Sequence, residues 1–203
     1  MRVPALFLVA CLVRPAAAED PPAAESLFPL AIGNAWTYKV SGQDDRFVVK
    51  VAAEEAVGAQ TCFKLEAWLK DKVVATEHLA FTKAGLCRFR AEHEDISPPV
   101  CILRVPVRNR PWTEKYTLGS REASYTFQAL TEDVPVPAGK FKATVVRAWV
   151  GESRPPGGDI RFLRATVWYA PGVGPVKQVV AEDGKGRFPV ALDLEKFEKS
   201  GGR

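Results

Sequence analysis

Residues 36–51 have the sequence WTYKVSGQDDRFVVKV, and this stretch decides the fold class. Apolar residues (Trp36, Tyr38, Val40) alternate with polar ones, and the alternation resumes from Phe47 after a Ser-Gly-Gln-Asp segment. Successive side chains of a β-strand point to opposite faces, so this period of two predicts half-buried strands. The short connection predicts an antiparallel hairpin, because parallel strands need a crossover of about a dozen residues.

The same alternation recurs along most of the chain. It is present in residues 61–69, 73–81, 112–118, 123–129, 141–150, 160–169, 176–180 and 188–197. Most connections are short and rich in Gly, Pro and Asp, which is typical of turns. No segment of roughly ten or more residues has the 3.6-residue spacing of an amphipathic helix, and the sequence AAEEA at residues 52–56 is expected to extend a strand. The sequence therefore predicts an all-β protein, a single antiparallel meander of about ten to twelve strands that is curved or rolled to cover its apolar face.

The composition is that of an ordinary globular protein. The 203 residues are 47% hydrophobic and 26% charged, and one domain suffices for this length. The net charge of +4 is spread along the chain rather than gathered in a basic block, which argues against nucleic-acid binding. We assign residues 28–197 to a single β-roll domain, residues 19–27 to a flexible Ala/Pro/Glu-rich leader and residues 198–203 to a flexible tail.

Residues 1–18 have the features of an export signal. An arginine precedes the apolar run at residues 3–13, and three alanines end at Ala18, after which we predict cleavage. The run is shorter than the roughly 20 residues of a transmembrane helix, and no transmembrane segment is expected. In the alternative, Leu-Val-Ala-Cys ending at Cys11 is a lipobox and Cys11 carries a lipid anchor. Both alternatives predict an exported bacterial protein, periplasmic or extracellular.

Three cysteines remain after cleavage at Ala18, namely Cys62, Cys87 and Cys101. Cys87 and Cys101 flank a Ser-Pro-Pro segment that we interpret as a connection, so they can face each other across an antiparallel pair and form a disulfide in an oxidising compartment. The alternative, which the sequence alone favours, is that both are buried free thiols. The absence of a Cys-x-x-Cys motif argues against a zinc ribbon or a thioredoxin-like site.

Histidine occurs only at His78 and His93. The sequence EHED at residues 92–95 is the densest polar cluster, and carboxylates beside an imidazole can bind a cation or transfer protons. Adjacent residues of an extended chain point to opposite sides, so we interpret the cluster as a solvated turn. The chain has no Gly-x-Ser-x-Gly or Cys-His nucleophile motif. We predict no catalytic residue, metal or cofactor.

Aromatic residues are numerous, with 5 Trp, 11 Phe and 4 Tyr. On alternating strands most of them belong to the core, but a rolled sheet can leave an apolar concavity that accepts an acyl chain or a peptide. Trp68 alternates with the apolar set and shares a face with Lys64 and Glu66, so it is either a covered surface residue or a ligand contact. We predict Trp68, Trp36 and Trp112 as ligand-binding residues.

Three motifs occur in order: FPLAIGNAWTY at residues 28–38, VPAGKF at 136–141 and WYAPGVGPVK at 168–177. Together they resemble a family of exported bacterial proteins of unknown function, in which these motifs punctuate a rolled antiparallel sheet. The resemblance covers residues 28–197 and implies an envelope location and a β-roll, with no activity to transfer. The prolines and glycines themselves indicate tight turns.

The sequence thus favours a non-catalytic exported envelope protein that binds a hydrophobic, lipid-like ligand or a protein partner on its rolled sheet. The alternatives are a structural or surface scaffold without a small ligand and an uncharacterised hydrolase. An apolar concavity lined by Trp and Phe favours the first function, and a filled interior with an exposed edge strand favours the scaffold. A cleft that holds histidine and carboxylates favours the hydrolase.

Overall fold

The structure, a computed structural model, describes residues 23–104, 110–118, 121–152, 161–182 and 190–201. These residues form one short helix and twelve strands. The elements are α1 (Ala24–Leu27), β1 (Ala35–Val40), β2 (Arg46–Val57), β3 (Gln60–Leu69), β4 (Lys72–Thr82), β5 (Gly85–Ala91), β6 (Glu94–Arg104), β7 (Trp112–Leu118), β8 (Arg121–Val136), β9 (Gly139–Glu152), β10 (Arg161–Ala170), β11 (Gly174–Glu182) and β12 (Val190–Glu198).

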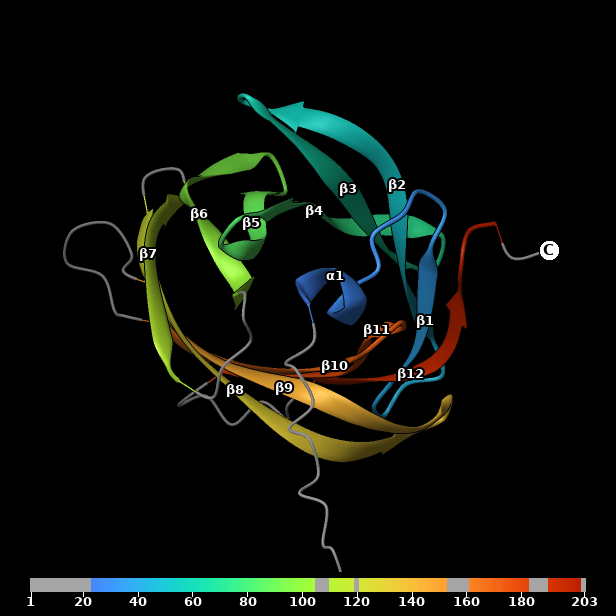
Figure 1. The fold of residues 1–203 in the computed structure, drawn as a ribbon. Coiled ribbons are helices and arrows are strands. Elements are labelled where there is room, and N and C mark those ends of the chain that lie inside the picture. The colour runs from blue at the N-terminus through green and yellow to red at the C-terminus, as the bar shows by residue number, and fades with distance from the viewer. Residues whose placement is uncertain (1–22, 105–109, 119–120, 153–160, 183–189, 202–203) are drawn as a thin grey trace, which may run out of the picture.

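The sheet is a closed antiparallel barrel (Figure 1). Each strand pairs with the strands before and after it in the chain, and β1 pairs with β12 to close the ring. The predicted all-β class and the single antiparallel meander are therefore confirmed, and the rolled sheet is more specifically a barrel. Closure leaves none of the described strands at an open edge, which removes the usual site of edge-to-edge association.

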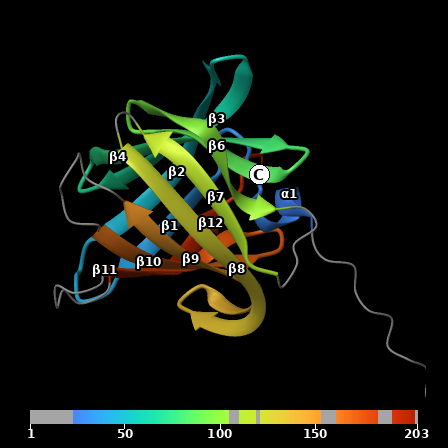
Figure 2. The same ribbon diagram turned by 90° about the vertical axis from the view of Figure 1, so that its left-hand side faces the viewer.

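Because successive strands run in opposite directions, the connections alternate between two ends of the barrel. One end, which we call the helix end, carries α1 and the turns at residues 33–34, 137–138 and 171–173 (Figure 2). The other, which we call the far end, carries the connections at residues 41–45, 70–71 and 92–93. Each strand thus runs from one end of the barrel to the other, and a residue is nearer the helix end or the far end according to its position along the strand.

The interior of the barrel at the helix end is filled by α1, which corrects the predicted leader. Residues 19–27 were expected to be flexible, but Ala24 and Leu27 are fully buried and Ser26 accepts a hydrogen bond from the Gly172 amide at 2.7 Å. A barrel of about eight strands is filled by its own side chains, whereas a wider one needs additional material inside. The apolar face of α1 supplies that material, so the folded domain begins at Ala24 rather than at residue 28.

The predicted flexible tail at residues 198–203 also needs correction. Strand β12 extends to Glu198, and the Ser200 amide donates a hydrogen bond to Oδ1 of Asn34 at 2.7 Å. The chain is therefore held to the barrel as far as Ser200. The predicted signal at residues 1–18, with its cleavage after Ala18, and the alternative anchor at Cys11 lie outside the described residues. Within the part that is described, no helix is both long and apolar enough to cross a membrane.

Two strands were not predicted from the alternation, β5 and β6. Residues 97–99, expected to form a connection, lie inside β6, and the turn is instead at residues 92–93. Proline cannot donate a ladder hydrogen bond, and Pro98 and Pro99 fall where the register jumps between the pairs Arg88–Val100 and Arg90–Asp95. The prolines therefore occupy an irregular part of the strand.

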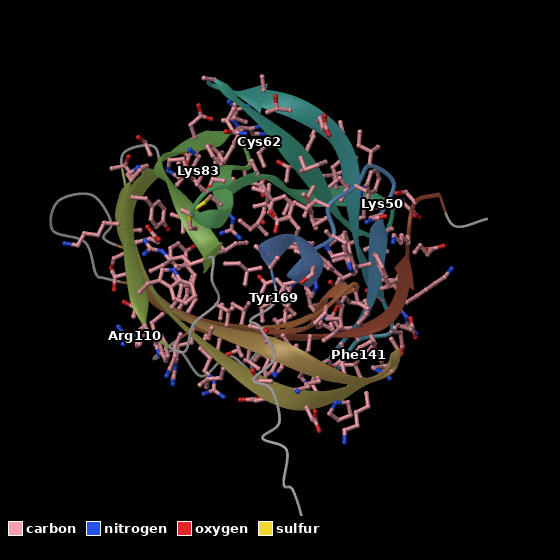
Figure 3. All side chains as sticks on the ribbon, viewed as in Figure 1. Lys50, Cys62, Lys83, Arg110, Phe141 and Tyr169 are labelled. Atoms are coloured by element: carbon pink, nitrogen blue, oxygen red, sulfur yellow. A yellow bond between two sulfur atoms is a disulfide. The ribbon has the colours of Figure 1, made fainter. Side chains whose placement is uncertain are left out.

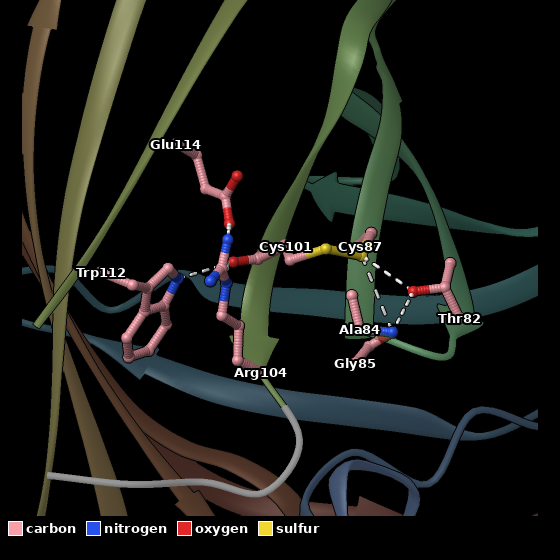
Figure 4. Close-up of a disulfide and its surroundings, with 8 residues drawn as sticks. All are labelled: Thr82, Ala84, Gly85, Cys87, Cys101, Arg104, Trp112 and Glu114. Atoms are coloured by element: carbon pink, nitrogen blue, oxygen red, sulfur yellow. Dashed lines mark hydrogen bonds and ion pairs between the residues drawn. A yellow bond between two sulfur atoms is a disulfide. The ribbon is translucent and has the colours of Figure 1, made fainter. Parts of the chain in front are cut away.

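A disulfide joins Cys87 of β5 to Cys101 of β6 (Figure 4). The two residues are direct cross-strand partners, and both are buried. The sequence had favoured free thiols for this pair, so the structure instead supports the disulfide alternative. Cys62 is a buried free thiol, and burial raises its pKa.

The three sequence motifs meet at the helix end. The Trp36 indole donates to the Val173 carbonyl at 2.6 Å, and the Tyr38 hydroxyl donates to the Pro175 carbonyl at 2.8 Å. A Cβ on Gly174, whose φ is +102°, would lie 2.9 Å from the Trp36 indole nitrogen, so glycine permits this approach. The central motif docks through the Ala138 amide, which donates to a carbonyl of β12 at 2.9 Å. The motifs therefore build the barrel end and its seam.

Candidate functional site

The barrel encloses a cavity of about 200 Å³. Phe28, which follows α1, lines it together with residues from the far-end halves of β2, β3 and β4. The helix end is thus filled, and the cavity extends towards the far end. Its apolar lining consists of Phe28, Trp36, Phe47, Val49, Leu65, Ala67, Ala75, Ile102, Val167 and Pro175.

Five polar or ionisable residues interrupt this apolar wall: Tyr38, Glu77, Arg88, Tyr169 and Gln178. Arg88 and Glu77 form an ion pair, with 2.9 Å between Nη2 and Oε1. The Arg88 side chain is 22% exposed and the Glu77 side chain 38%, so the arginine lies deeper. The Nε of Arg88 is shielded from solvent and has no hydrogen-bond partner among the described residues.

Arg88 keeps its charge in this setting. Burial disfavours the guanidinium, but the carboxylate of Glu77 and the nearby tyrosines favour it, and the net effect raises the pKa of Arg88 above its usual value. Both partners of the ion pair line the cavity, and Arg88 is the less exposed of the two. The cavity is therefore apolar with one ion pair on its wall.

The two tyrosines of the cavity are neutral hydroxyls. Burial raises the pKa of Tyr38 well above its ordinary value, with Tyr169 adding to the rise. Burial also raises the pKa of Tyr169, an effect that Arg88 opposes and Glu77 reinforces. Figure 3 labels Tyr169 inside the barrel, beside α1. Because Tyr38 donates its proton to the Pro175 carbonyl, its role is structural.

The three predicted ligand-binding tryptophans do not come together. Trp36 is fully buried and lines the cavity. Trp112 stacks on Phe127, with 5.1 Å between ring centroids, and does not belong to the cavity wall. Trp68 lies in a separate surface groove of about 270 Å³, where Lys50 stands 5.2 Å from its ring centroid. The ligand-binding role of the three residues stays a prediction, and they lie apart because parity along a strand assigns a face but not a position along the barrel.

The histidines lie outside the cavity wall as well. His78 is 3% exposed, and its Nε2 lies 2.9 Å from Oε2 of Glu55, while His93 is exposed at a turn. Glu55 also pairs with Lys64 at 3.0 Å. Within the described ranges, no group of three or more His, Cys, Asp or Glu side chains is arranged to hold a metal ion.

Sequence reasoning missed the ion pair of Glu77 and Arg88. A signal was present, since Glu77 has the parity of Leu79, and Arg88 has the parity of Leu86, both of which are core residues. A charged residue in phase with core residues on each of two neighbouring strands indicates a buried pair. The signal depends on both strands, and β5, which contains Arg88, is not predicted from the sequence alternation.

Comparisons with known proteins concern the fold alone. No protein-family model and no curated protein matches the chain. A candidate lipoprotein from Parabacteroides distasonis has a similar structure, with a TM-score of 0.52 and 13% identity over 85% of this chain and 98% of that one. A candidate exported protein with a YmcC-like fold from Bacteroides fragilis gives a TM-score of 0.46 with 14% identity over 85% of this chain and 98% of that one. The first similarity supports the barrel fold.

Proposed function

We propose that this chain is a non-catalytic, exported protein of the bacterial cell envelope that binds an apolar, lipid-like ligand inside its barrel. The observation that carries the proposal is the cavity of about 200 Å³ with its largely apolar wall. A pocket of this kind, with a few polar groups, is the usual form of a small-molecule site. The export part of the proposal is based on the sequence of residues 1–18 and on the motifs that resemble exported proteins.

The alternatives have less support. A scaffold that associates through an exposed edge strand is disfavoured, because the described strands close into a ring. A hydrolase built on histidine and carboxylates needs them together in a cleft, whereas His78 pairs with Glu55 away from the cavity wall. The cavity is lined by Phe28, Trp36 and Phe47, which is the arrangement expected of a hydrophobic-ligand site.

Native mass spectrometry of the exported protein, purified from the envelope of its own host, tests this function. Extracted small molecules and metals are analysed in parallel. A stoichiometric apolar adduct is the expected result. Bare protein, with no adduct after mild extraction and no binding of added amphiphiles, would instead favour a scaffold or a protein partner, and a bound divalent ion would favour the enzyme alternative.

A pair of variants locates the ligand. Ala67→Phe adds a ring to the cavity wall and is expected to abolish binding. Ala52→Phe adds the same ring at an exposed position of β2 and should leave binding intact. Equal binding by both variants would place the ligand elsewhere on the protein and contradict the internal site.

A further inference from the structure

The cavity has an unfilled hydrogen-bonding capacity at Arg88. A guanidinium carries five N–H donors in a planar fork, and the contact with Glu77 is an ion pair between Nη2 and Oε1 at 2.9 Å. Nε is shielded from solvent and therefore also from a ligand, so the donors open to a ligand belong to the rest of the Arg88 side chain, which lines the cavity and is 22% exposed. A buried charged donor left without an acceptor is costly, so an acceptor supplied by a ligand would be favourable.

The charge balance favours an acidic acceptor over a neutral one. Glu77 is 38% exposed and partly hydrated, whereas Arg88 is 22% exposed and lies deeper. Arg88 is therefore the more desolvated partner, and an anionic acceptor would compensate its charge better than a neutral one. A carboxylate has two oxygens in the plane that a guanidinium fork recognises.

The size of the cavity limits the apolar part of the ligand. Its volume is about 200 Å³. Cavities of about 150 Å³ accept a benzene ring, and pockets for larger drug-like molecules begin at roughly 300 Å³. A single ring or a medium-length acyl chain fits these limits, and a longer chain would have to extend towards the far end.

We infer that the ligand is an acidic amphiphile whose carboxylate binds Arg88 while its apolar body fills the cavity. The inference rests on the proposed function and adds the chemistry of the head group. Glu77 is the competitor for the same guanidinium, so it tunes the affinity for the acid. The structure thus assigns opposite effects on binding to the two partners of one ion pair.

Isothermal titration calorimetry with octanoate and octanol tests the head group. The two probes share an apolar chain and differ in charge. In the unmodified exported protein we expect octanoate to bind about ten- to a hundredfold more tightly than octanol, the range of a charge-assisted hydrogen bond. Arg88→Met should reduce this ratio to near one, and Glu77→Gln should strengthen octanoate binding without changing octanol binding.

The matched control is Arg90→Met. Arg90 lies two residues further along β5 and pairs with Asp95, but it does not line the cavity. Its replacement should leave the ratio unchanged. Arg88→Met leaves the Glu77 carboxylate without its partner, which can destabilise the protein. The double variant Glu77→Gln with Arg88→Met lacks both charges and tests the same ratio without an unpaired carboxylate.

The outcomes separate the inference from the function on which it rests. A ratio near one in the unmodified protein, or a ratio that survives in both Arg88 variants, overturns the acidic head group and leaves apolar binding intact. Failure of both probes to bind overturns the cavity as a ligand site and the inference with it. A ratio above ten that is lost only in the Arg88 variants supports the inference.

Discussion

Asn34 joins the segment just before the first strand to the segment just after the last strand, at the helix end of the barrel. Asn34 is 1% exposed. Nδ2 donates to the Pro29 carbonyl at 2.7 Å, and Oδ1 accepts from the Ser200 amide at 2.7 Å. These bonds lie beside the seam where β1 meets β12. Replacing Asn34 by Ala therefore removes both bonds at the point of ring closure.

The expected loss of stability is estimated from the hydrogen bonds that the Pro29 carbonyl and the Ser200 amide lose. A buried polar group left without a partner costs about 1–3 kcal/mol, whereas a group that water can reach costs less. Pro29 and Ser200 are both half-buried, so water reaches each group in part, and the loss of either bond alone is expected to cost about 1 kcal/mol. We expect Asn34→Ala to lower the free energy of unfolding by about 2 kcal/mol. For a chain of this size the melting temperature should fall by roughly 4–8 °C.

Urea unfolding, followed by tryptophan fluorescence, measures this change, since Trp36 lies two residues away in the same strand region. A chain shortened after Lys199 is the matched control, because it deletes the bond to Ser200 and keeps the bond to Pro29. It should lose about 1 kcal/mol or less. A loss below about 0.5 kcal/mol in Asn34→Ala, or an equal loss in both proteins, would refute the argument that the Pro29 bond stabilises the seam.

Three further changes test other parts of the fold. Replacing both Cys87 and Cys101 by Ala should cost about 3 kcal/mol for a separation of 14 residues, and residues 19–203 produced in an oxidising compartment should have one free thiol, Cys62, before reduction; three would contradict the disulfide. A Cβ on Gly85 would lie 1.9 Å from a backbone oxygen of the neighbouring strand, so Gly85→Ala should destabilise far more than Gly58→Ala, which has open space; similar melting temperatures would disprove this difference. Hydrogen bonds from His78 and Lys64 lower the pKa of Glu55, so its contribution to stability is present above the ordinary pKa of a glutamate, about 4.3, and lost as the pH falls through the lowered pKa. Glu55→Gln should therefore flatten the loss of stability on acidification below about pH 4.3, and parallel pH profiles would contradict this.

Local patterning was sufficient to predict the strands and their antiparallel order, because period-two alternation and short turns depend on neighbouring residues alone. Local patterning could not predict ring closure, because the pairing of β1 with β12 joins residues far apart in sequence and depends on the number and tilt of the strands. The same limit explains α1, whose sequence AESL resembles a linker until a barrel interior surrounds it. The composition of residues 24–27 is a local property, whereas their burial depends on the barrel that the rest of the chain forms around them.

The candidate site was harder to predict than the fold, for a related reason. Large aromatic residues are prominent in the sequence, but they do not all mark the cavity. Trp68 lies in a surface groove and Trp112 in an aromatic stack, both outside the cavity wall. Glu77 and Arg88 stand in ordinary strand segments and gain significance only because β4 and β5 pair and direct them inwards. To detect this pair from the sequence, one must know which residues of β4 and which residues of β5 point into the barrel.

The motifs contribute to the apolar wall of the cavity, through Phe28, Trp36, Tyr169 and Pro175, but not to its ion pair. Their hydrogen bonds through Trp36, Tyr38 and Asn34 hold the helix end and the seam together. The ion pair of Glu77 and Arg88 lies on strands β4 and β5, which contain none of the motif residues. A chain can therefore keep all three motifs, and with them the barrel, while the charged residues of the cavity change. Under the proposed function, the head-group preference of this chain therefore depends on Glu77 and Arg88, and the apolar fit depends in part on the motif residues.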